Sequence, residues 1–392
     1  MNIESNRNIL ILTTVSGFLC KFEIENVKTL QQLGYVVHYA TNTEEPHYHF
    51  EESELEELGV QMHHIDIARS PYMIRANERA RKQLIQIVKE YNIQAVHAHT
   101  PVGGVLARKV AKHLRKLKII YTAHGFHFYK GAPLINNTFY RYAEKFYARY
   151  TDIVVVINEE DYQSAKKLRL RKGGTAHKIE GVGLDLEKFS PLTKEQRDKQ
   201  RKKLGIGEND FFAISVGELN ENKNQGIVLE AIAKKAQGTA FAKKLKYGIC
   251  GDGFLNEQIH TDIERLKLKD IVLMFGYRKN VSEILGCADL FIFPSKREGL
   301  GMAALEALAM QVPVLASDNR GTREYMQHTK NGYVCNCNDI DGFVQGIDYI
   351  MNLTVREQKE MKSYARESIR RFDKGITKQK MREIYLKLDK ML

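Results

Sequence analysis

Two carboxylates and a group of glycines in the second half of the chain have residue types and a spacing that can hold a phosphorylated ligand. Glu298 and Glu306 lie eight residues apart, and Gly299 and Gly301 lie between them. An apolar run ends just before Glu298, and an apolar helical pattern begins near Gly301. Glycines let a ligand approach the backbone, and the free N–H groups of a helix N-terminus bind anions such as a pyrophosphate. The two carboxylates can accept hydrogen bonds from separate hydroxyls of one long ligand, although an ordinary strand–loop–helix with surface glutamates shows the same pattern.

Three further loops of this half carry groups suited to phosphate binding. Lys223 follows an apolar run that predicts a strand, and the motifs Gly251-Asp252-Gly253 and Gly276-Tyr277-Arg278 follow two more. A lysine or arginine can neutralise a phosphate, and a glycine-rich turn exposes backbone amides. Each motif is weak by itself, because a surface lysine or a structural turn has the same sequence.

In the first half, a loop with Gly17 follows the first apolar run and His124 follows a later one. His97, His99 and His127 also lie at or near the ends of expected strands. Imidazoles can bind metal, but no carboxylate or cysteine accompanies these histidines at a metal-ligand spacing. Residues two apart on a strand share a face whereas residues three apart do not. We therefore expect no metal site and no essential metal cofactor.

The stretch from Glu298 to Glu306 resembles the Glu-x7-Glu signature of the family 4 glycosyltransferases, which are retaining enzymes of the GT-B fold that use nucleotide sugars. The continuation 311–318 is similar to the family pattern, with Gln311 where the family usually has Gly. The resemblance implies that Glu298 contacts hydroxyls of the donor sugar and that Glu306 binds the ribose.

The resemblance extends over nearly the whole chain. Lys223 matches the lysine that holds the donor phosphates, and His124 matches the histidine that faces the donor sugar. Glu218 stands where many members have Arg, so that Arg278 or Lys296 would supply the missing cation. The other donor-binding positions that the resemblance implies are Gly17, Gly253, Gly299, Leu300 and Gly301.

The segments 122–128 and 217–220 resemble bacterial capsule and exopolysaccharide glycosyltransferases. This resemblance implies a retaining transfer of a sugar from a UDP-sugar to an undecaprenyl-diphosphate-linked saccharide. Two alternatives stay open, namely a GT-B sugar-nucleotide enzyme such as a UDP-sugar 2-epimerase and a basic nucleic-acid-binding protein. Against the second, the sequence shows no helix-turn-helix, zinc module or aromatic-studded sheet motif.

The elements that must position these residues follow from the hydrophobic pattern. Short apolar runs alternate with longer amphipathic stretches, which predicts βα units around parallel sheets. Ligands bind such sheets at the carboxyl ends of the strands, where the loops described above lie. The expected strands are 9–13, 36–40, 95–97, 119–122 and 153–157 in the first half and 211–216, 245–250, 271–275, 290–293 and 314–316 in the second.

We predict two Rossmann-like, doubly wound α/β domains of the GT-B class that face each other across a cleft. The first, 1–185, would take the acceptor, and the second, 208–354, would take the nucleotide sugar. A polar stretch with Pro191 predicts a linker over 186–207. The charged segment 355–392 has helical spacing and is expected to return to the first domain.

The composition is that of a globular protein with an excess of basic residues. The 392 residues are 43% hydrophobic and 28% charged, and 60 Lys+Arg against 48 Asp+Glu give a formal charge of +12. These values exclude a disordered, collagen-like or coiled-coil chain, and the charge favours phosphate-bearing partners. Five scattered cysteines do not make a disulfide framework. Since no apolar run approaches the ~20 residues that span a bilayer, we expect a cytoplasmic protein that at most lies against the inner face of the membrane.

The positive charge concentrates in two acid-free runs of the first half, 105–118 and 166–178. In the first run, apolar residues recur every three or four positions, which predicts an amphipathic helix. Such a helix can rest on an anionic membrane, where each cation contributes about 1 kcal/mol, or pack on its own sheet with a solvated outer face. The membrane and acceptor side is then expected at Arg108, Lys109, Lys112, Arg115 and Lys116.

Overall fold

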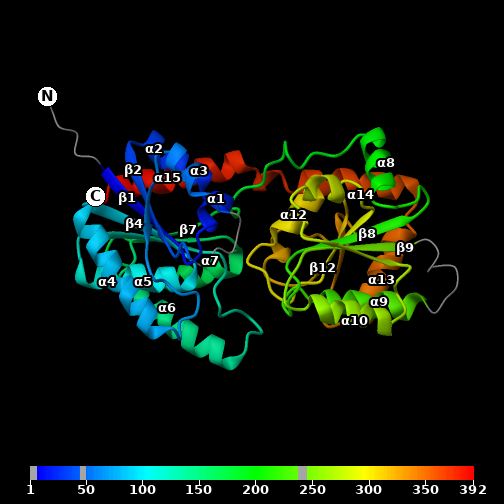
Figure 1. The fold of residues 1–392 in the computed structure, drawn as a ribbon, viewed down its shortest axis with the longest axis horizontal. Coiled ribbons are helices and arrows are strands. Elements are labelled where there is room, and N and C mark those ends of the chain that lie inside the picture. Colours follow the sequence, from blue (N-terminus) through cyan, green and yellow to red (C-terminus); the bar gives the residue numbers. More distant parts are fainter. Residues whose placement is uncertain (1–6, 45–49, 237–244) are drawn as a thin grey trace. The chain divides into compact units, whose positions relative to one another are not determined.

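The computed structural model describes residues 7–44, 50–236 and 245–392, and the chain divides into two compact units. The first unit combines Met1–Gly183 with Lys374–Leu392, and the second is Leu184–Asp373. Each unit contains a parallel β-sheet with helices on both faces (Figure 1). The predicted class, two doubly wound Rossmann-like domains, is confirmed.

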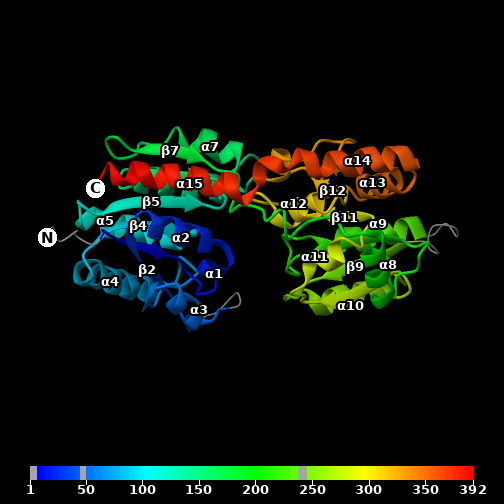
Figure 2. The same cartoon turned by 90° about the horizontal axis from the view of Figure 1, so that it is seen from above.

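The sheet of the first unit has seven strands in the order β3-β2-β1-β4-β5-β6-β7, and the labels β7, β5, β4 and β2 follow one another in this order across the sheet in Figure 2. Its central strands are largely buried and mostly apolar because helices cover both faces. Ile9 of β1, for example, pairs with Val37 on one side and with Ala95 on the other. The strands are β1 (Arg7–Leu12), β2 (Tyr35–Thr41), β3 (Gln61–His64), β4 (Ile93–His99), β5 (Lys118–Ala123), β6 (Ile153–Val156) and β7 (Thr175–Lys178).

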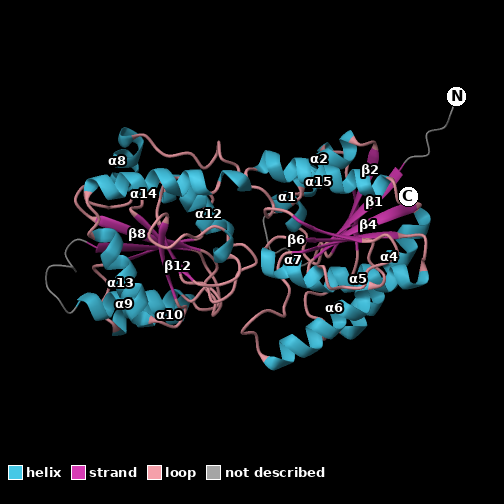
Figure 3. Cartoon of the chain, turned by 180° about the vertical axis from the view of Figure 1, so that it is seen from behind, coloured by secondary structure: helices cyan, strands magenta, loops and turns pink. Residues whose placement is uncertain are grey.

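The helices of the first unit form two layers. Helices α2 and α15 lie on one face of the sheet, and α4, α5 and α6 lie on the other (Figures 1 and 3). The bounds are α1 (Phe18–Phe22), α2 (Ile24–Gln32), α3 (Glu52–Glu57), α4 (Ile74–Glu90), α5 (Pro101–His113), the π-helical turn η1 (Asn136–Tyr140), α6 (Arg141–Ala148), α7 (Glu159–Ala165) and α15 (Lys374–Asp389).

The sheet of the second unit has the strand order β10-β9-β8-β11-β12-β13. Its strands are β8 (Phe211–Val216), β9 (Leu245–Cys250), β10 (Val272–Gly276), β11 (Leu290–Phe293), β12 (Val314–Ser317) and β13 (Gly332–Cys335). Its helices are α8 (Lys194–Lys203), α9 (Gln225–Ala236), α10 (Asn256–Arg265), α11 (Val281–Leu285), α12 (Met302–Ala309), η2 (Thr322–Glu324), α13 (Ile340–Met351), α14 (Val355–Ser368) and η3 (Arg370–Phe372).

The strands that the sequence analysis did not predict are β3, β7 and β13, and each lies at an edge of its sheet. β3 has the sequence QMHH and β7 the sequence TAHK, and neither contains a fully buried residue. An edge strand needs no apolar run, because one side of it has no neighbouring strand and its faces are partly open to solvent. All ten predicted strands are present, with shifts of one or two residues at most of their ends.

The stretch interpreted as a linker, 186–207, belongs to the second unit and contains α8. Arg201 of α8 is buried, and its guanidinium lies 3.2 Å from the carboxylate of Asp289. Residues 355–392 divide between the units, since α14 lies in the second unit and α15 in the first. The sequence of α8 resembles a linker because its one buried side chain is the charged Arg201, which an ion pair holds in place, so the helix has no apolar stripe.

The basic run 105–118 differs from its prediction in one position and in its extent. Helix α5 begins at Pro101 and ends at His113, so that Arg115 and Lys116 follow the helix instead of continuing it. Lys109 and Lys112 are exposed as expected, but Arg108 is fully buried. Its guanidinium donates two hydrogen bonds, of 2.6 and 3.2 Å, to the carboxylate of Glu144. The assignment of Arg108 to a membrane surface is therefore wrong.

Within the described residues, we find no helix that combines the length and the apolar character needed to cross a membrane.

Replacement of Arg108 by Met would leave the Glu144 carboxylate buried without its partner. We expect R108M to lose about 3–5 kcal/mol of the free energy of unfolding, measured by urea denaturation with circular dichroism. Lys109→Met, at the neighbouring exposed position, is the control and should change stability by less than about 0.5 kcal/mol. The double variant R108M/E144M should recover part of the loss. Equal stability of R108M and K109M would contradict the buried ion pair.

Candidate active site

Loops at the carboxyl edge of the first sheet bring together several of the predicted site residues. Gly17 follows β1 and precedes α1, while His124 follows directly after β5. The ring of Phe18, next to Gly17, lies 5.2 Å from the His124 ring and 5.5 Å from the His99 ring, measured between centroids. Parallel strands place these loops at one edge of the sheet, as the sequence predicted.

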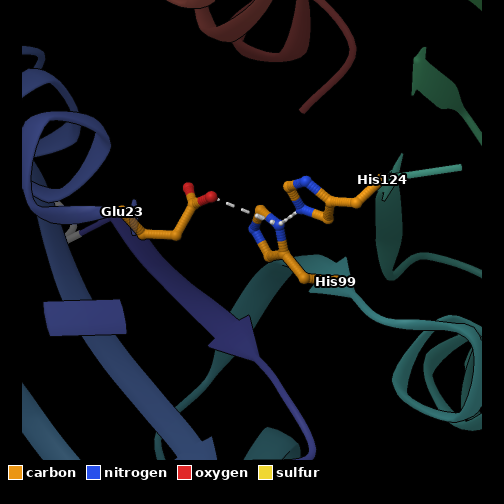
Figure 4. A group of neighbouring side chains, drawn as sticks. All are labelled: Glu23, His99 and His124. Carbon is orange, nitrogen blue, oxygen red and sulfur yellow. Dashed lines mark hydrogen bonds and ion pairs between the residues drawn. The ribbon is translucent and has the colours of Figure 1, made fainter. Parts of the chain in front are cut away.

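Three polar side chains meet behind this edge, as Figure 4 shows. Nδ1 of His99, at the end of β4, lies 3.1 Å from Nε2 of His124 and 3.4 Å from Oε1 of Glu23. Glu23 is the residue between α1 and α2, and its other oxygen accepts a 2.6 Å hydrogen bond from Asn26. A cavity of about 20 Å³, large enough for one water molecule, borders all three side chains.

Burial keeps this cluster uncharged near neutral pH. Loss of solvent raises the pKa of the Glu23 carboxyl from its ordinary 4.5 to about 8 and lowers the pKa of His124 from 6.5 to about 4. The pKa of His99 falls well below 6.5 for the same reason, and the nearby His97 and His124 lower it further. Glu23 and His99 are thus in contact as neutral groups rather than as an ion pair.

The hydrogen-bond network indicates where the protons of the two imidazoles lie. Nε2 of His99 is buried and has no hydrogen-bond partner among the described residues. A proton there would be an unsatisfied buried donor, so the favourable tautomer of His99 carries its proton on Nδ1 and donates it to Nε2 of His124. His124 then carries its own proton on Nδ1, which makes no hydrogen bond within the described part of the chain. His124 can therefore donate to a hydroxyl of a ligand.

Glu23 is a site residue that sequence reasoning missed. The histidines were expected to have no carboxylate at metal-ligand spacing, yet the ligand atoms of Glu23, His99 and His124 lie within 4.8 Å of one another. Two imidazoles and a carboxylate form a donor set that zinc accepts. No local motif connects Glu23 with His99, 76 residues further on, because only the packing of α1 and α2 on the sheet brings them together.

In the second unit, Lys223 and Glu298 form a direct ion pair. Nζ of Lys223 lies 2.6 Å from Oε1 of Glu298, and both side chains are only partly exposed. The loops that carry them, after β8 and β11, are further joined by hydrogen bonds from Asn222 to the carbonyl of Arg297 and from the Lys296 amide to the carbonyl of Asn222. The two candidate donor-binding residues from separate motifs are thus brought together.

Gly251 and Gly253 allow two loops of this unit to pack closely. A Cβ atom at Gly251 would lie 1.9 Å from the carbonyl oxygen of Gly217, and one at Gly253 would lie 2.4 Å from that of Leu219. No side chain fits at either position, so this Gly-x-Gly motif is required by backbone packing whatever the ligand. The assignment of Gly253 to donor binding remains a prediction.

The motif around Gly301 begins α12 as predicted. Gly301 is the N-cap of this helix with φ of 93°, in the left-handed region, and a Cβ there would lie 2.7 Å from the Phe293 ring. Gly299 precedes it in the loop, Leu300 is buried, and Glu306 lies on α12 and is partly exposed. The backbone amides at this N-terminus are the kind that bind phosphate oxygens.

Three cations of the structure are candidates for the phosphate-binding role of the arginine that Glu218 replaces. Arg278 and Lys296 are exposed, and Arg278 donates to the carbonyl of Phe275. Arg320, which sequence reasoning did not consider, is buried, and its Nε lies 3.4 Å from the backbone oxygen of Glu298. The sequence could have pointed to Arg320 through its position just after the strand β12, because the ligand-binding loops of a parallel sheet follow the strands.

Comparisons with known proteins agree with this architecture. Residues 196–368 match the family described as glycosyl transferases group 1, and residues 8–159 match that described as glycosyl transferase 4-like. Anabaena Alr3699/HepE, solved in complex with UDP and glucose, has a TM-score of 0.77 at 18% identity, over 97% of this chain and 100% of that chain. The likeness to this solved structure shows the two-domain GT-B fold.

Two relatives are similar in sequence. EpsD of Bacillus subtilis (strain 168), named as a glycosyltransferase, is 35% identical over 381 residues, which cover 97% of this chain and 96% of that protein. UDP-Gal:alpha-D-GlcNAc-diphosphoundecaprenol alpha-1,3-galactosyltransferase of Escherichia coli is 28% identical over 276 residues, which cover 69% and 70% of the two chains. The chain belongs to this glycosyltransferase family, as the sequence motifs predicted.

The raised pKa of Glu23 predicts a pH dependence of stability. Between pH 4.5, its ordinary pKa, and about 8 the folded chain keeps a proton that the unfolded chain releases, so this carboxyl costs stability as the pH rises through that range. We expect the melting temperature of Glu23→Gln, relative to the native chain, to increase from pH 5 to about pH 8, measured by scanning calorimetry.

Glu57→Gln, on an exposed position of α3, is the matched control and should melt in parallel with the native chain at every pH. If Glu23→Gln also follows the native chain in parallel, the carboxyl of Glu23 is ionised when folded and the neutral cluster is wrong.

Proposed function

We propose that this chain is a retaining glycosyltransferase that moves a sugar from a UDP-sugar to a lipid-diphosphate-linked saccharide in the synthesis of a cell-surface polysaccharide. Because the proposed acceptor is linked to a membrane lipid, we propose that the reaction takes place at the cytoplasmic face of the membrane. The observation that carries the proposal is the Lys223–Glu298 ion pair at the loop that leads to the N-terminus of α12, because it puts a phosphate-binding cation, a sugar-binding carboxylate and backbone amides of a helix N-terminus in one loop cluster.

The proposed chemistry separates the charges of this pair. A diphosphate attracts the ammonium group of Lys223 and competes for it with Glu298, whose carboxylate is then available to accept hydrogen bonds from sugar hydroxyls. As the bond from the anomeric carbon to the β-phosphate oxygen breaks, negative charge grows on that oxygen. Lys223 and the amides of Gly299–Gly301 stabilise this charge, which lowers the barrier only because they bind the leaving diphosphate more tightly than the intact donor.

The acceptor hydroxyl attacks the anomeric carbon and loses a proton in the same step. We assign the role of base to the departing β-phosphate oxygen, because no residue of the described chain has been identified as a nucleophile for a covalent sugar intermediate. His124 contributes a hydrogen bond from Nδ1 to a hydroxyl of the sugar, and His99 fixes the tautomer that makes this donation available.

The relatives support the choice of substrates. The Escherichia coli relative is named for transfer from UDP-Gal to GlcNAc-diphosphoundecaprenol, and the Anabaena structure contains UDP and glucose. A further relative, 26% identical over 298 residues, is named for colanic acid biosynthesis in Escherichia coli. These names support a sugar–UDP donor and a lipid-diphosphate acceptor for this chain.

The ion pair predicts opposite effects of two substitutions on UDP binding. Lys223→Met removes the cation and should weaken UDP binding, whereas Glu298→Gln removes the competing carboxylate and should strengthen it. Both variants should nevertheless lose about 100-fold or more in kcat/KM, measured as UDP release from a panel of UDP-sugars with prenyl-diphosphate-linked N-acetylglucosamine in detergent. UDP binding is measured by calorimetric titration.

Glu221→Gln and Lys330→Met, two exposed positions of the same unit, are the matched controls and should keep native binding and turnover. Unchanged turnover in both Lys223→Met and Glu298→Gln would refute the site. Release of UDP together with a free 2-epimerised sugar, without any acceptor, would instead identify an epimerase.

We further propose that transfer needs no bound metal, because Lys223 and the backbone amides neutralise the leaving diphosphate. Dialysis against EDTA should therefore leave the rate of UDP release unchanged, and elemental analysis of the purified chain should find no stoichiometric metal. If EDTA abolished the activity and zinc or manganese restored it, this proposal would be contradicted. If His99→Ala or Glu23→Gln also prevented that restoration, the Glu23–His99–His124 cluster would be identified as a metal centre.

A further inference from the structure

The segment 134–148, which contains η1 and α6, exposes four large apolar side chains. Leu134 is 85% exposed, Ile135 69%, Phe139 58% and Tyr142 71%. Ile135, Phe139 and Tyr142 follow one another at steps of four and three residues, which places them on the same side of a helix. Single exposed apolar residues are common on proteins, but a contiguous cluster of this size marks a contact surface.

The opposite face of the segment packs against the rest of the first unit, and these contacts fix the orientation of α6. Glu144 and Ala148 are buried, and the Glu144 carboxylate accepts both hydrogen bonds from Arg108 of α5. The ring of Tyr140 lies 4.9 Å from that of His127, centroid to centroid. These contacts hold the helix with Phe139 and Tyr142 turned outward.

The apolar cluster is accompanied by cations and by no exposed acid. In the segment 129–150 the sole acidic residue is Glu144, which is buried. Arg141 and Arg149 are exposed and lie over the rings of Phe128 and Phe146, and Lys145 between them is also exposed.

Helix α5 carries further exposed cations of the same unit. It lies on the same face of the sheet as α6 (Figures 1 and 3) and contacts it. Its outer side exposes Lys109 and Lys112, and the turn after it exposes Arg115 and Lys116. Apart from Arg108, the cations that the sequence analysis assigned to a membrane are exposed on the neighbouring helix and in the turn after it, whereas the apolar cluster lies in the segment 134–142.

We propose that the outer face of the segment 134–149, here defined as Leu134, Ile135, Phe139, Tyr142, Arg141, Lys145 and Arg149, docks the protein on an anionic lipid bilayer. Aromatic and aliphatic side chains enter the headgroup region, while the flanking cations meet anionic lipids. Since the segment exposes no acidic side chain, it would meet no like-charge repulsion from an extended anionic surface. The proposal rests on the proposed function, since docking brings the chain to a lipid-linked acceptor.

The docking face also lies close along the chain to the candidate active site. Leu134 is ten residues beyond His124, in the connection that leaves the carboxyl edge of the first sheet. A headgroup-level contact at this point would hold that edge next to the membrane surface, where the diphosphate of a lipid-linked acceptor lies.

The test is co-sedimentation of the full chain with vesicles of phosphatidylcholine alone or mixed with phosphatidylglycerol. We expect binding to the anionic vesicles that weakens as salt is raised. Arg141→Gln/Lys145→Gln should bind about 30-fold more weakly, the factor that corresponds to ~1 kcal/mol for each of two cations. Phe139→Ser/Tyr142→Ser should lose binding to the same vesicles. Phe254→Ser/Val355→Ser, which replaces two equally exposed apolar side chains of the second unit, is the control and should bind like the native chain.

The outcomes separate docking from the proposed reaction. The Phe139→Ser/Tyr142→Ser variant should keep native UDP binding and native transfer to a short, water-soluble prenyl-diphosphate acceptor, and should lose transfer only to acceptor embedded in vesicles. Native vesicle binding by this variant, or failure of the native chain to bind anionic vesicles, would overturn the docking face. A native dimer that this variant converts to a monomer would also overturn it, since the face would then join two copies. Vesicle binding through Phe139 and Tyr142 without any transfer activity would retain docking and reject the proposed function.

Discussion

The parallel arrangement of the strands is the constraint from which the rest of this structure follows. Parallel strands need helical crossovers, so helices cover both faces of each sheet, and all loops after strands gather at the carboxyl edges. Gly17 and His124 reach one edge in this way, as do Lys223 and Glu298 in the other unit. The glycines at 251 and 253 serve the same constraint, because they let the loops after β8 and β9 approach to backbone contact.

The candidate site residues of the two units differ in their electrostatics, and burial explains the difference. Glu23, His99 and His124 lie behind the first sheet edge and are kept neutral by desolvation. Lys223 and Glu298 remain partly in contact with solvent and form an ion pair. A neutral cluster suits hydrogen bonding to sugar hydroxyls, whereas a charged pair suits a diphosphate that can exchange partners with it.

The excess of basic residues acquires a more specific meaning from the structure. A formal charge of +12 indicates phosphate-bearing partners in general. Arg108 does not contribute to any surface, because Glu144 neutralises it inside the first unit. The exposed cations of α6 and its flanks instead lie in the same segment as exposed apolar side chains, and this combination favours the proposed lipid contact over a nucleic-acid groove.

The sequence by itself determined the strands of the sheet interiors, the two-unit organisation and the family, because these depend on local periodicity and on short motifs such as Glu298 to Glu306. It could not reveal β3 or β7, whose edge positions require no apolar run. Only the tertiary structure decided that Glu23 joins His99, that Arg108 is buried and that Phe139 is exposed. Each of these depends on which face of a helix meets the sheet and on contacts between residues far apart in the chain. A helical sequence with charges on several sides does not determine how the helix is rotated about its axis.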